Sequence, residues 1–416
     1  MRLLHTSDWH LGQYFYGKSR ANEHQAFLTW LLKQATEVSA DVILVAGDIF
    51  DTANPPSYAR EMYFDFIAKV NQIGCQLIVV AGNHDSAAML GESKQVLSHL
   101  NTHVVTHVEG NKPENILIKN SLGDPLGVVC AIPFIRPRDV VKSVAGQNAQ
   151  EKQRHLQQAI ATHYQTCFEQ AKTLISSNAL PVVGTGHLTT VGASTSDSVR
   201  DIYIGTLDAF PADGFPNFDY LALGHIHQSQ KVAKSERIRY CGSPIALSFD
   251  EAKQQKYVHL VDVDSQTCEV ERIEVPTSQQ LIMLNESVED IKNQVLSVIA
   301  SFDIPLDELK NRPVWLDIEV NSDEYHHDIA QRIDNHLSEL PVEVLRVRRS
   351  KAQRIALMEK REKVVLEELD VSDVFNQRLA KEGDMDISTD VSAEQNQRMT
   401  VLYQQMVEKV QTQEES

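Results

Sequence analysis

Five short apolar stretches constrain this 416-residue chain more than any other feature of its sequence. The clearest lies within QLIVVAGNHD, residues 76–85, where residues 77–80 are apolar and mostly β-branched. A short, fully apolar run between turn residues predicts a buried strand of a parallel sheet. The other four stretches occupy residues 3–6, 42–46, 181–185 and 220–223.

Each predicted strand is followed by a Gly or Ser and then by side chains that can bind metal ions or transfer protons. In chain order these are Ser7-Asp8-Trp9-His10, Gly47-Asp48, Gly82-Asn83-His84-Asp85, Gly186-His187 and Gly224-His225-Ile226-His227. A helix-capping turn explains any one of these segments, because Asn and Asp are common in turns and caps. Helix capping does not explain why all five segments share this pattern. Ligands gather at the carboxyl ends of strands in α/β sheets, so we predict one shared site.

Helices alternate with the strands in the first half of the chain. Residues 23–38, 57–73 and 151–174 carry apolar side chains at helical spacing, and further strands are predicted at 116–118 and 128–132. This alternation indicates βαβ units and a mostly parallel sheet, hence an α/β fold. Strands predicted at 238–240, 257–262 and 269–273 suit the second half of a two-layer sheet.

A domain boundary is expected at Pro276. After it, helices at 288–299 and 329–340 alternate with strands at 314–320 and 342–347, which describes a small α+β unit. At about 70 residues it is smaller than most independent domains, so we expect it to pack on the first domain.

The tail, residues 350–416, predicts two amphipathic helices around 355–369 and 399–410, separated by a polar, Asp-rich linker. These helices have no evident core of their own. Either they fold back on this chain or they dock on a partner, and we favour a partner.

Composition is that of a water-soluble protein. No apolar run approaches the roughly 20 residues that span a bilayer, and no signal peptide is visible, so we expect a cytoplasmic protein. The cysteines lack C-x-x-C spacing and are expected to be reduced core residues. They are Cys75, Cys130, Cys167, Cys241 and Cys268.

The formal net charge of -18 argues against a simple electrostatic DNA-binding protein. Charge is nevertheless segregated along the chain. Some of the acid lies in the predicted site, where divalent cations would reverse the local sign, and much of the rest lies in the tail, whereas residues 346–363 are mainly basic. The net figure therefore says little about any one surface.

The candidate ligands suit a pair of metal ions. Asp8 and His10 are two residues apart, as are His225 and His227, and in extended chain such pairs point to the same side. Carboxylate, imidazole and amide ligands together suit manganese, iron or zinc better than calcium. One ion with an open position cannot use all the candidates, but two ions bridged by Asp48 can. The full set is Asp8, His10, Asp48, Asn83, His187, His225 and His227.

Two ions about 3.5 to 4 Å apart can clamp the attacking and leaving oxygens of an in-line displacement at phosphorus. His84 is then free to stabilise the transition state or protonate the leaving oxygen, and we expect Asp85 to orient it. Two interpretations of Asp51 remain open, since it can cap the following helix or support the site from behind.

These five motifs, in this order, resemble the calcineurin-like metallophosphoesterase superfamily. Closer features resemble its SbcD family of bacterial exonuclease subunits: LLHTSDWHLG, VAGDIFD, VAGNHD, LALGHIHQSQ, the YCGSP turn at 240–244 with Phe249, and the small α+β unit. The resemblance implies a two-layer mixed-sheet metallophosphoesterase sandwich over residues 1–275. It also implies a capping domain at 276–349 that helps present DNA, and C-terminal helices at 350–416 that bind the coiled coil of an SbcC-type ATPase.

Carried over by position, one manganese ion would be held by Asp8, His10, Asp48 and His227, and the other by Asp48, Asn83, His187 and His225. His84 matches the catalytic histidine of the family. The resemblance further implies a homodimer through helices near 57–73 and 91–100. The implied activity is 3′–5′ exonuclease on double-stranded ends and endonuclease on single strands and hairpins, in DNA repair, recombination and replication.

Two other functions are compatible with parts of the sequence. A phosphodiesterase or phosphatase for nucleotides or phosphoproteins would use the same metal site, but it would not need the capping unit and the tail. A scaffold that has lost catalysis would lack a ligand or His84, and all of these are present.

Overall fold

The computed structural model describes residues 1–108, 114–141, 148–175, 179–191, 193–194, 209–302, 304–320, 329–349, 398–399 and 402–403. Spatial contacts divide the described residues into two compact units. The first contains Met1–Met283, Asp303–Asp317 and Pro341–Leu345, and the second contains Leu284–Phe302, Ile318–Leu340 and the described residues from Arg346 on. Apart from 398–399 and 402–403, the predicted tail helices lie outside the described residues. The division of the chain at 275/276 and 349/350 stays a prediction.

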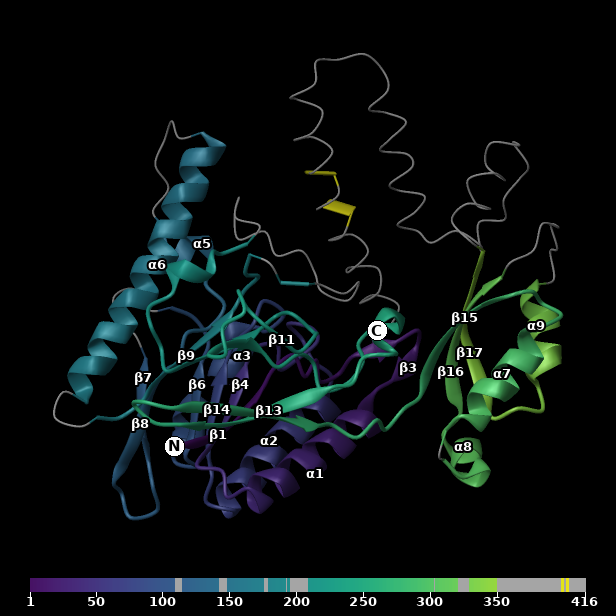
Figure 1. The fold of residues 1–416 in the computed structure, drawn as a ribbon, viewed down its shortest axis with the longest axis horizontal. Helices are drawn as coiled ribbons and strands as arrows, with labels where there is room; N and C mark the ends of the chain where they lie inside the picture. Colours follow the sequence, from purple (N-terminus) through teal and green to yellow (C-terminus); the bar gives the residue numbers. More distant parts are fainter. Residues whose placement is uncertain are drawn as a thin grey trace. The chain divides into compact units, whose positions relative to one another are not determined.

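The first unit contains two six-stranded sheets (Figure 1). The order in one sheet is β14 (Cys268–Glu274), β13 (Tyr257–Val263), β1 (Arg2–Thr6), β4 (Val42–Ala46), β5 (Gln76–Val80) and β6 (Thr102–Val105). Neighbouring strands from β1 to β6 are parallel, whereas β13 pairs antiparallel with both β1 and β14. The carboxyl ends of β1, β4 and β5 therefore meet at one edge of this sheet.

The order in the other sheet is β11 (Gln230–Lys231), β12 (Ile238–Tyr240), β10 (Tyr220–Gly224), β9 (Val182–His187), β8 (Pro125–Cys130) and β7 (Asn115–Lys119). The inner strands β12, β10, β9 and β8 are parallel, and β11 and β7 close the sheet antiparallel at its edges. Both sheets are thus mixed, as the sequence predicted.

Alternation along each central strand explains why it is apolar throughout. In β4, Val42 and Leu44 belong to the core between the sheets, whereas Ile43 and Val45 pack in the core that includes α1 (Ala21–Glu37) and α2 (Ser57–Gln72). Successive side chains on a strand point to opposite faces, so a strand covered on both sides needs apolar residues at every position. All of β4 is buried.

The second sheet is covered by α6 (Ala149–Leu174), which begins with a capping box. The Asn148 side chain accepts a hydrogen bond from the Glu151 backbone at 2.9 Å, and the Glu151 side chain accepts one from the Asn148 backbone. Leu156, Ile160 and Tyr164 of α6 pack on this sheet. The layers are therefore helix, sheet, sheet and helix.

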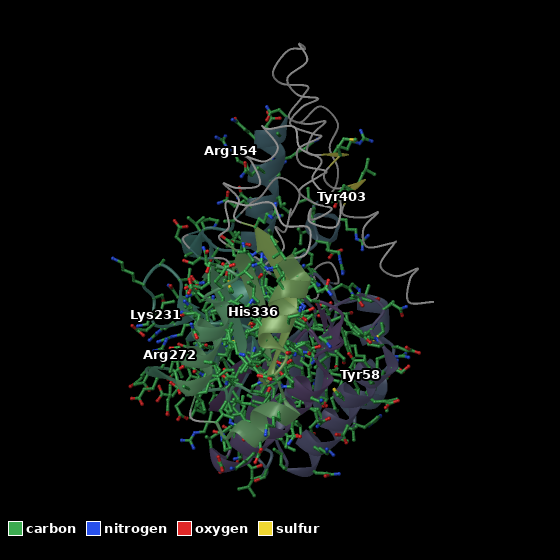
Figure 2. All side chains as sticks on the ribbon, turned by 90° about the vertical axis from the view of Figure 1, so that its right-hand side faces the viewer. Tyr58, Arg154, Lys231, Arg272, His336 and Tyr403 are labelled. Atoms are coloured by element: carbon green, nitrogen blue, oxygen red, sulfur yellow. The ribbon has the colours of Figure 1, made fainter. Side chains whose placement is uncertain are left out.

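Shorter elements complete the first unit. They are the hairpin β2 (Tyr14–Phe15) and β3 (Lys18–Ser19), the helices α3 (Ala87–Gly91), α4 (Lys94–Ser98) and α5 (Pro137–Val140), and the 3-10 turns η1 (Ala212–Gly214) and η2 (Phe249–Glu251). At the outer edges of the sheets, β11 and β14 carry the exposed Lys231 and Arg272, which Figure 2 shows at the surface. Long charged side chains on edge strands oppose edge-to-edge association with another sheet.

A three-stranded sheet follows, in the order β15 (Leu281–Glu286), β16 (Val314–Val320) and β17 (Val342–Arg349). Its helices are α7 (Ile291–Ala300), α8 (Leu306–Asn311) and α9 (Ile329–Leu337). In the first unit, Trp315 at the start of β16 stacks on Phe15 of β2, with ring centroids 5.8 Å apart, in a cluster with Phe249 and Leu281.

The predicted α/β fold with a smaller α+β portion is confirmed, and every strand and helix predicted before residue 350 is present. The prediction missed β6, β15, β11, the β2–β3 hairpin and the short helices α3, α5 and α8. All five cysteines are free thiols, four of them buried. Among the described helices, none has both the length and the apolar character required to cross a membrane.

A buried polar chain connects the two sheets. The Tyr220 hydroxyl of β10 lies 2.8 Å from His5 Nδ1 on β1 and 3.4 Å from His259 Nδ1 on β13. All three side chains are almost fully buried, and burial lowers the pKa of His5 to about 3. In this dry interface the hydroxyl is the described partner of Nδ1 on both rings, while Ser229 Oγ lies 2.9 Å from His259 Nε2.

We expect Tyr220→Phe to lower the free energy of unfolding by about 1–3 kcal/mol, because it leaves buried imidazole nitrogens without that partner. Tyr63→Phe is the matched control. The Tyr63 hydroxyl on α2 is buried and has no hydrogen-bond partner among the described residues, so its removal should be nearly neutral. Denaturant unfolding of both variants measures the difference, and equal losses would contradict the role given to Tyr220.

Candidate metal centre

The structure brings the seven predicted ligands together where the carboxyl ends of five strands meet. Asp8 and His10 follow β1, Asp48 follows β4, Asn83 follows β5, His187 ends β9, and His225 and His227 follow β10. Six of them are at most 3% exposed, and Asn83 is partly exposed. Residues more than 200 positions apart in the chain thus share one buried site.

The backbone at the site departs from the extended conformation assumed for the Asp-x-His and His-x-His pairs. Asp8, His10 and Asp48 have φ angles of 54°, 48° and 52°, and His225 has a φ of 96°. These are left-handed conformations, which are uncommon for residues other than glycine. The argument from extended spacing is therefore wrong, and tight turns beyond the strand ends direct these side chains inward.

Glycines allow the strand ends to approach one another. A Cβ atom on Gly224 would lie 1.9 Å from the Ala46 carbonyl oxygen, and one on Gly82 would lie 2.1 Å from Asp48 Oδ1. Neither distance is possible for a real side chain. The glycines that precede the ligands in the sequence motifs are thus needed for close packing of neighbouring strands.

The candidate ligand atoms form three overlapping groups among the described residues, each with its atoms within 4.8 Å of one another. Asp8, His10 and His227 make up one group, and Asp48, His187 and His225 make up another. The third, His10, Asp48 and His84, lies between them, since it shares His10 with the first and Asp48 with the second. Asp48 Oδ2 is 3.1 Å from His187 Nε2 and 3.7 Å from His10 Nε2. This position fits a carboxylate that bridges two ions.

Two buried nitrogens support metal binding. His10 Nε2 and His225 Nε2 have no hydrogen-bond partner among the described residues. A buried nitrogen without a partner is costly, and coordination to a cation would satisfy it. On the opposite side of its ring, His10 Nδ1 lies 3.1 Å from Asp51 Oδ1. A contact of this kind, between a carboxylate and the ring nitrogen that does not face the metal, commonly orients histidines in metal sites. The donor set therefore fits divalent metal ions.

The electrostatics also favour cations. Burial by itself would lower the pKa of His10 and of His187. For His10, the hydrogen bond that its Nδ1 donates to Asp51 and the charge of Asp48 outweigh burial, and for His187 the nearby Asp48 does so. The pKa of each histidine rises to about 9. Since a metal competes with protons for the same nitrogens, the carboxylates that hold these protons would also attract a cation.

His84 lies beside the ligand groups. Its ring centroid is 4.7 Å from that of His10, and its Nδ1 is 2.7 Å from the Asp51 carbonyl oxygen. The His84 backbone nitrogen donates to Asp48 Oδ1 at 2.9 Å. His84 Nδ1 is therefore oriented by a backbone carbonyl, and its position fits the predicted contact with a substrate phosphate.

Asp85 connects two loops of the site. Its carboxylate accepts hydrogen bonds from the backbone nitrogens of Ile49 at 3.2 Å, Phe50 at 3.0 Å and Gly82 at 2.8 Å. It thus holds the loop after β4 against the loop after β5. The orienting of His84 by Asp85 stays a prediction.

The structure decides between the two interpretations of Asp51. Helix α2 begins at Ser57 with Pro56 at its N-cap, so Asp51 does not cap it. Its carboxylate instead accepts from His10 Nδ1 and supports the site from behind.

Sequence reasoning missed two supporting residues. The Ser7 hydroxyl donates to Asp8 Oδ2 at 2.5 Å, and Glu251 Oε1 lies 3.3 Å from His227 Nδ1. Glu251 is 24 positions from His227, and no short spacing links the two.

We expect Asp85→Asn to lower the free energy of unfolding by about 1–3 kcal/mol, since an amide cannot accept all the hydrogen bonds that the carboxylate accepts. Asp219→Asn is the control, because the Asp219 carboxylate accepts from one described backbone nitrogen, that of Val182, at 2.8 Å, and the carbonyl of Asn can replace it. Thermal unfolding of both variants provides the comparison. A loss at position 219 as large as that at position 85 would contradict the proposed connection between the loops.

Comparison with known proteins agrees with this geometry. The family model described as calcineurin-like phosphoesterase matches residues 1–229. A second model, described as type 5 capsule protein repressor C-terminal domain, matches residues 277–383. The fold and the site together define a calcineurin-like phosphoesterase.

Similar sequences identify the family within the calcineurin-like phosphoesterases. The chain is 52% identical over 383 residues to the SbcD subunit of the nuclease SbcCD from Escherichia coli K12, covering 92% of this chain and 93% of that protein. It is 28% identical to the SbcD subunit from Bacillus subtilis, covering 77% of this chain and 79% of that one. Among solved structures, a dimetal phosphatase from Danio rerio aligns at 10% identity with a TM-score of 0.39, over 67% of this chain and 99% of that one. The chain belongs to the SbcD family of calcineurin-like phosphoesterases.

Proposed function

We propose that this chain is the metal-dependent DNA nuclease subunit of an ATPase–nuclease complex, and that it hydrolyses DNA phosphodiester bonds with two manganese ions. The observation that carries the proposal is the set of overlapping ligand groups around Asp48, with His84 beside them. Family membership supports nuclease activity over the phosphatase alternative, because the two SbcD relatives named above are nuclease subunits.

The residues have separate roles in this reaction. Asp8, His10, Asp48 and His227 would hold one ion, and Asp48, Asn83, His187 and His225 the other. Two bound divalent cations would acidify a water molecule and neutralise charge on the phosphoryl oxygens. His84, oriented by the Asp51 carbonyl, would donate a proton or a hydrogen bond to the phosphate or to the leaving oxygen.

Manganese is proposed on the family resemblance, and the donor set of carboxylate, amide and imidazole is one that manganese accepts. We further propose 3′–5′ exonuclease activity on double-stranded ends and endonuclease activity on single strands and hairpins, in the cytoplasm. The family resemblance supports these specific activities and the associated roles in repair, recombination and replication.

Three partners are proposed: DNA, an SbcC-type coiled-coil ATPase and a second copy of this chain. The ATPase is supported by the relatives, which are named as subunits of the SbcCD complex. The homodimer is supported by the family resemblance alone, with α2 and residues 91–100, which include α4, as the proposed contact.

We expect His84→Gln to bind two ions and to cleave DNA about 100- to 10,000-fold more slowly, because it removes proton transfer and leaves the predicted ligands intact. Asp48→Asn should bind fewer than two ions and be inactive. The measurement is degradation of a blunt, end-labelled duplex with manganese, together with a count of bound metal.

His163→Gln on α6 serves as the control and should retain full activity, because that histidine is not among the predicted ligands. If the wild-type chain and its ATPase partner leave DNA intact with manganese but hydrolyse small phosphoesters, the nuclease proposal fails and the phosphatase alternative replaces it.

A chain that ends at Arg349 should bind two ions and hydrolyse a small aryl phosphodiester, yet it should no longer co-purify with the ATPase. The reason is that the predicted amphipathic helices lie after this position and are proposed to dock on the coiled coil. Co-purification with the partner, in parallel with the metal count, tests this. Retained binding of the truncated chain would show that the docking surface lies elsewhere.

A further inference from the structure

A buried ion pair lies behind one of the predicted ligands. Glu251 ends the short turn η2 and is fully buried, and Lys256 is nearly so. Lys256 Nζ lies 2.5 Å from Glu251 Oε2. Removing two charges from water is expensive, and such a pair persists only where further hydrogen bonds complete it. Those further bonds lead to His227.

The pair holds both the ring and the backbone of His227. Glu251 Oε1 lies 3.3 Å from His227 Nδ1, while Lys256 Nζ donates to the His227 carbonyl oxygen at 3.1 Å and to Ser243 Oγ at 3.0 Å. Glu251 Oε2 also accepts from the Leu247 backbone nitrogen at 3.1 Å. The Glu251 carboxylate is therefore held in place by Lys256 and Leu247, independently of its contact with the histidine.

This contact selects one form of the imidazole. When Nδ1 carries the proton and donates it to Glu251, the lone pair is on Nε2, the nitrogen on the far side of the ring. His227 is grouped with Asp8 and His10, so Nε2 is the atom available to a shared ion. We infer that Glu251, held in place by Lys256, is a positioning residue that makes His227 a metal ligand. This inference rests on the proposed dinuclear metal centre.

The two ligand groups differ in how their histidines are supported. In the group of Asp8, both histidines contact a carboxylate, His10 that of Asp51 and His227 that of Glu251. In the other group, His187 Nδ1 contacts the neutral carbonyl oxygen of Ala46 at 2.9 Å. A carboxylate behind an imidazole makes it a stronger ligand. Loss of Glu251 should therefore weaken the ion held by His227 and leave the other ion unaffected.

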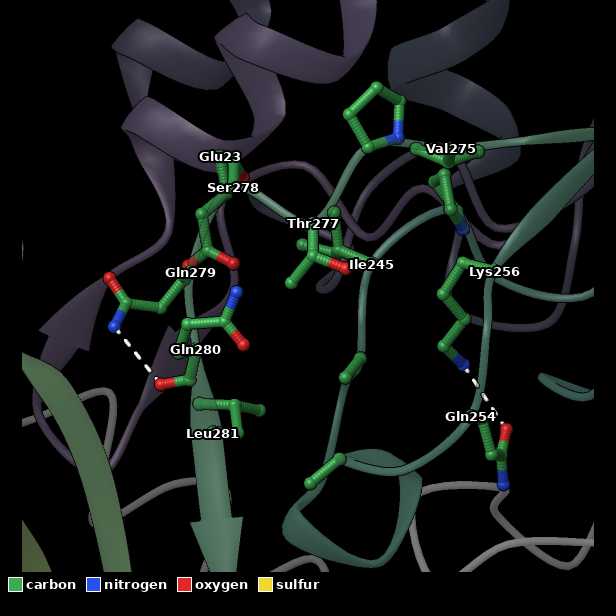
Figure 3. A pocket seen from close by; sticks show the side chains of 14 residues that line it. Glu23, Ile245, Gln254, Lys256, Val275, Thr277, Ser278, Gln279, Gln280 and Leu281 are labelled. Carbon is green, nitrogen blue, oxygen red and sulfur yellow. Dashed lines mark hydrogen bonds between the residues drawn. The ribbon is translucent and has the colours of Figure 1, made fainter. Parts of the chain in front are cut away.

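The chain offers a matched control. Figure 3 shows Lys256 and Glu23 lining the same pocket. Glu23 is also buried and also forms an ion pair, with Arg20. No described contact joins the Glu23 side chain to a predicted ligand. Glu23→Gln thus removes a buried, paired carboxylate as Glu251→Gln does, without removing support from a metal ligand.

The test is titration of the full-length, metal-free chain with manganese by calorimetry, with paramagnetic resonance to count bound ions. Wild type should bind two ions. Glu251→Gln should bind one of them about 10- to 100-fold more weakly and the other with unchanged affinity. Glu23→Gln should lower the melting temperature and leave both affinities at the wild-type values.

If Glu251→Gln binds both ions as wild type does, or weakens both equally, the positioning role is overturned. If this variant fails to fold, the double variant Glu251→Gln with Lys256→Met, which leaves no buried charge unpaired, is titrated for the same result. Wild-type chain that binds fewer than two ions would overturn the proposed metal centre itself, and this outcome is separate from a failure of the Glu251 role.

Discussion

The buried carboxylate of Asp48 is the interaction on which the site depends. One of its oxygens accepts from the His84 backbone, and the other lies close to nitrogens of His187 and His10. These partners come from the loop after β1, from the loop after β5 and from the end of β9, hence from both sheets. A charge removed from water in this way is tolerable only with several compensating groups around it. The geometry of the site therefore depends on how the two sheets pack against each other.

This arrangement has a local cost that the rest of the fold offsets. Left-handed backbone at Asp8, His10 and Asp48 is unfavourable by about 1–3 kcal/mol at each residue. Such conformations persist where the surrounding structure permits no other, and here hydrogen bonds between the loops hold them. The Asp8 backbone nitrogen donates to Gly47 and that of His10 donates to Asp48, at 2.9 and 3.1 Å. The loops in turn rest on strands that are buried on both faces.

The histidines illustrate a general feature of buried metal sites. Three of the four histidines proposed as ligands are held at one ring nitrogen by a group outside the proposed ligand set: His10 by Asp51, His187 by Ala46 and His227 by Glu251. Orientation therefore comes from carboxylates and a carbonyl that belong to other segments of the chain. The loop that contains Glu251 also contributes Phe249, which packs with Phe15 and Trp315. The support of the metal centre is thus continuous with an apolar cluster of the first unit.

Residue types and their order suffice to predict the strands that lead to the site, because an apolar run that ends in Gly and then Asp or His is typical of a buried strand that leads into a polar turn. They also identify the candidate ligands, since carboxylate and imidazole are the groups that bind such metals. Strand β6 was not predicted because Thr102 and His103 interrupt its apolar pattern. Strand β15 was not predicted because it follows directly after the expected domain boundary at Pro276. Only the tertiary structure decides how each ring is turned and what holds it. Hydrogen-bond partners such as Glu251 and Asp51 reach the site from separate loops, and loop conformation depends on packing that no local spacing encodes.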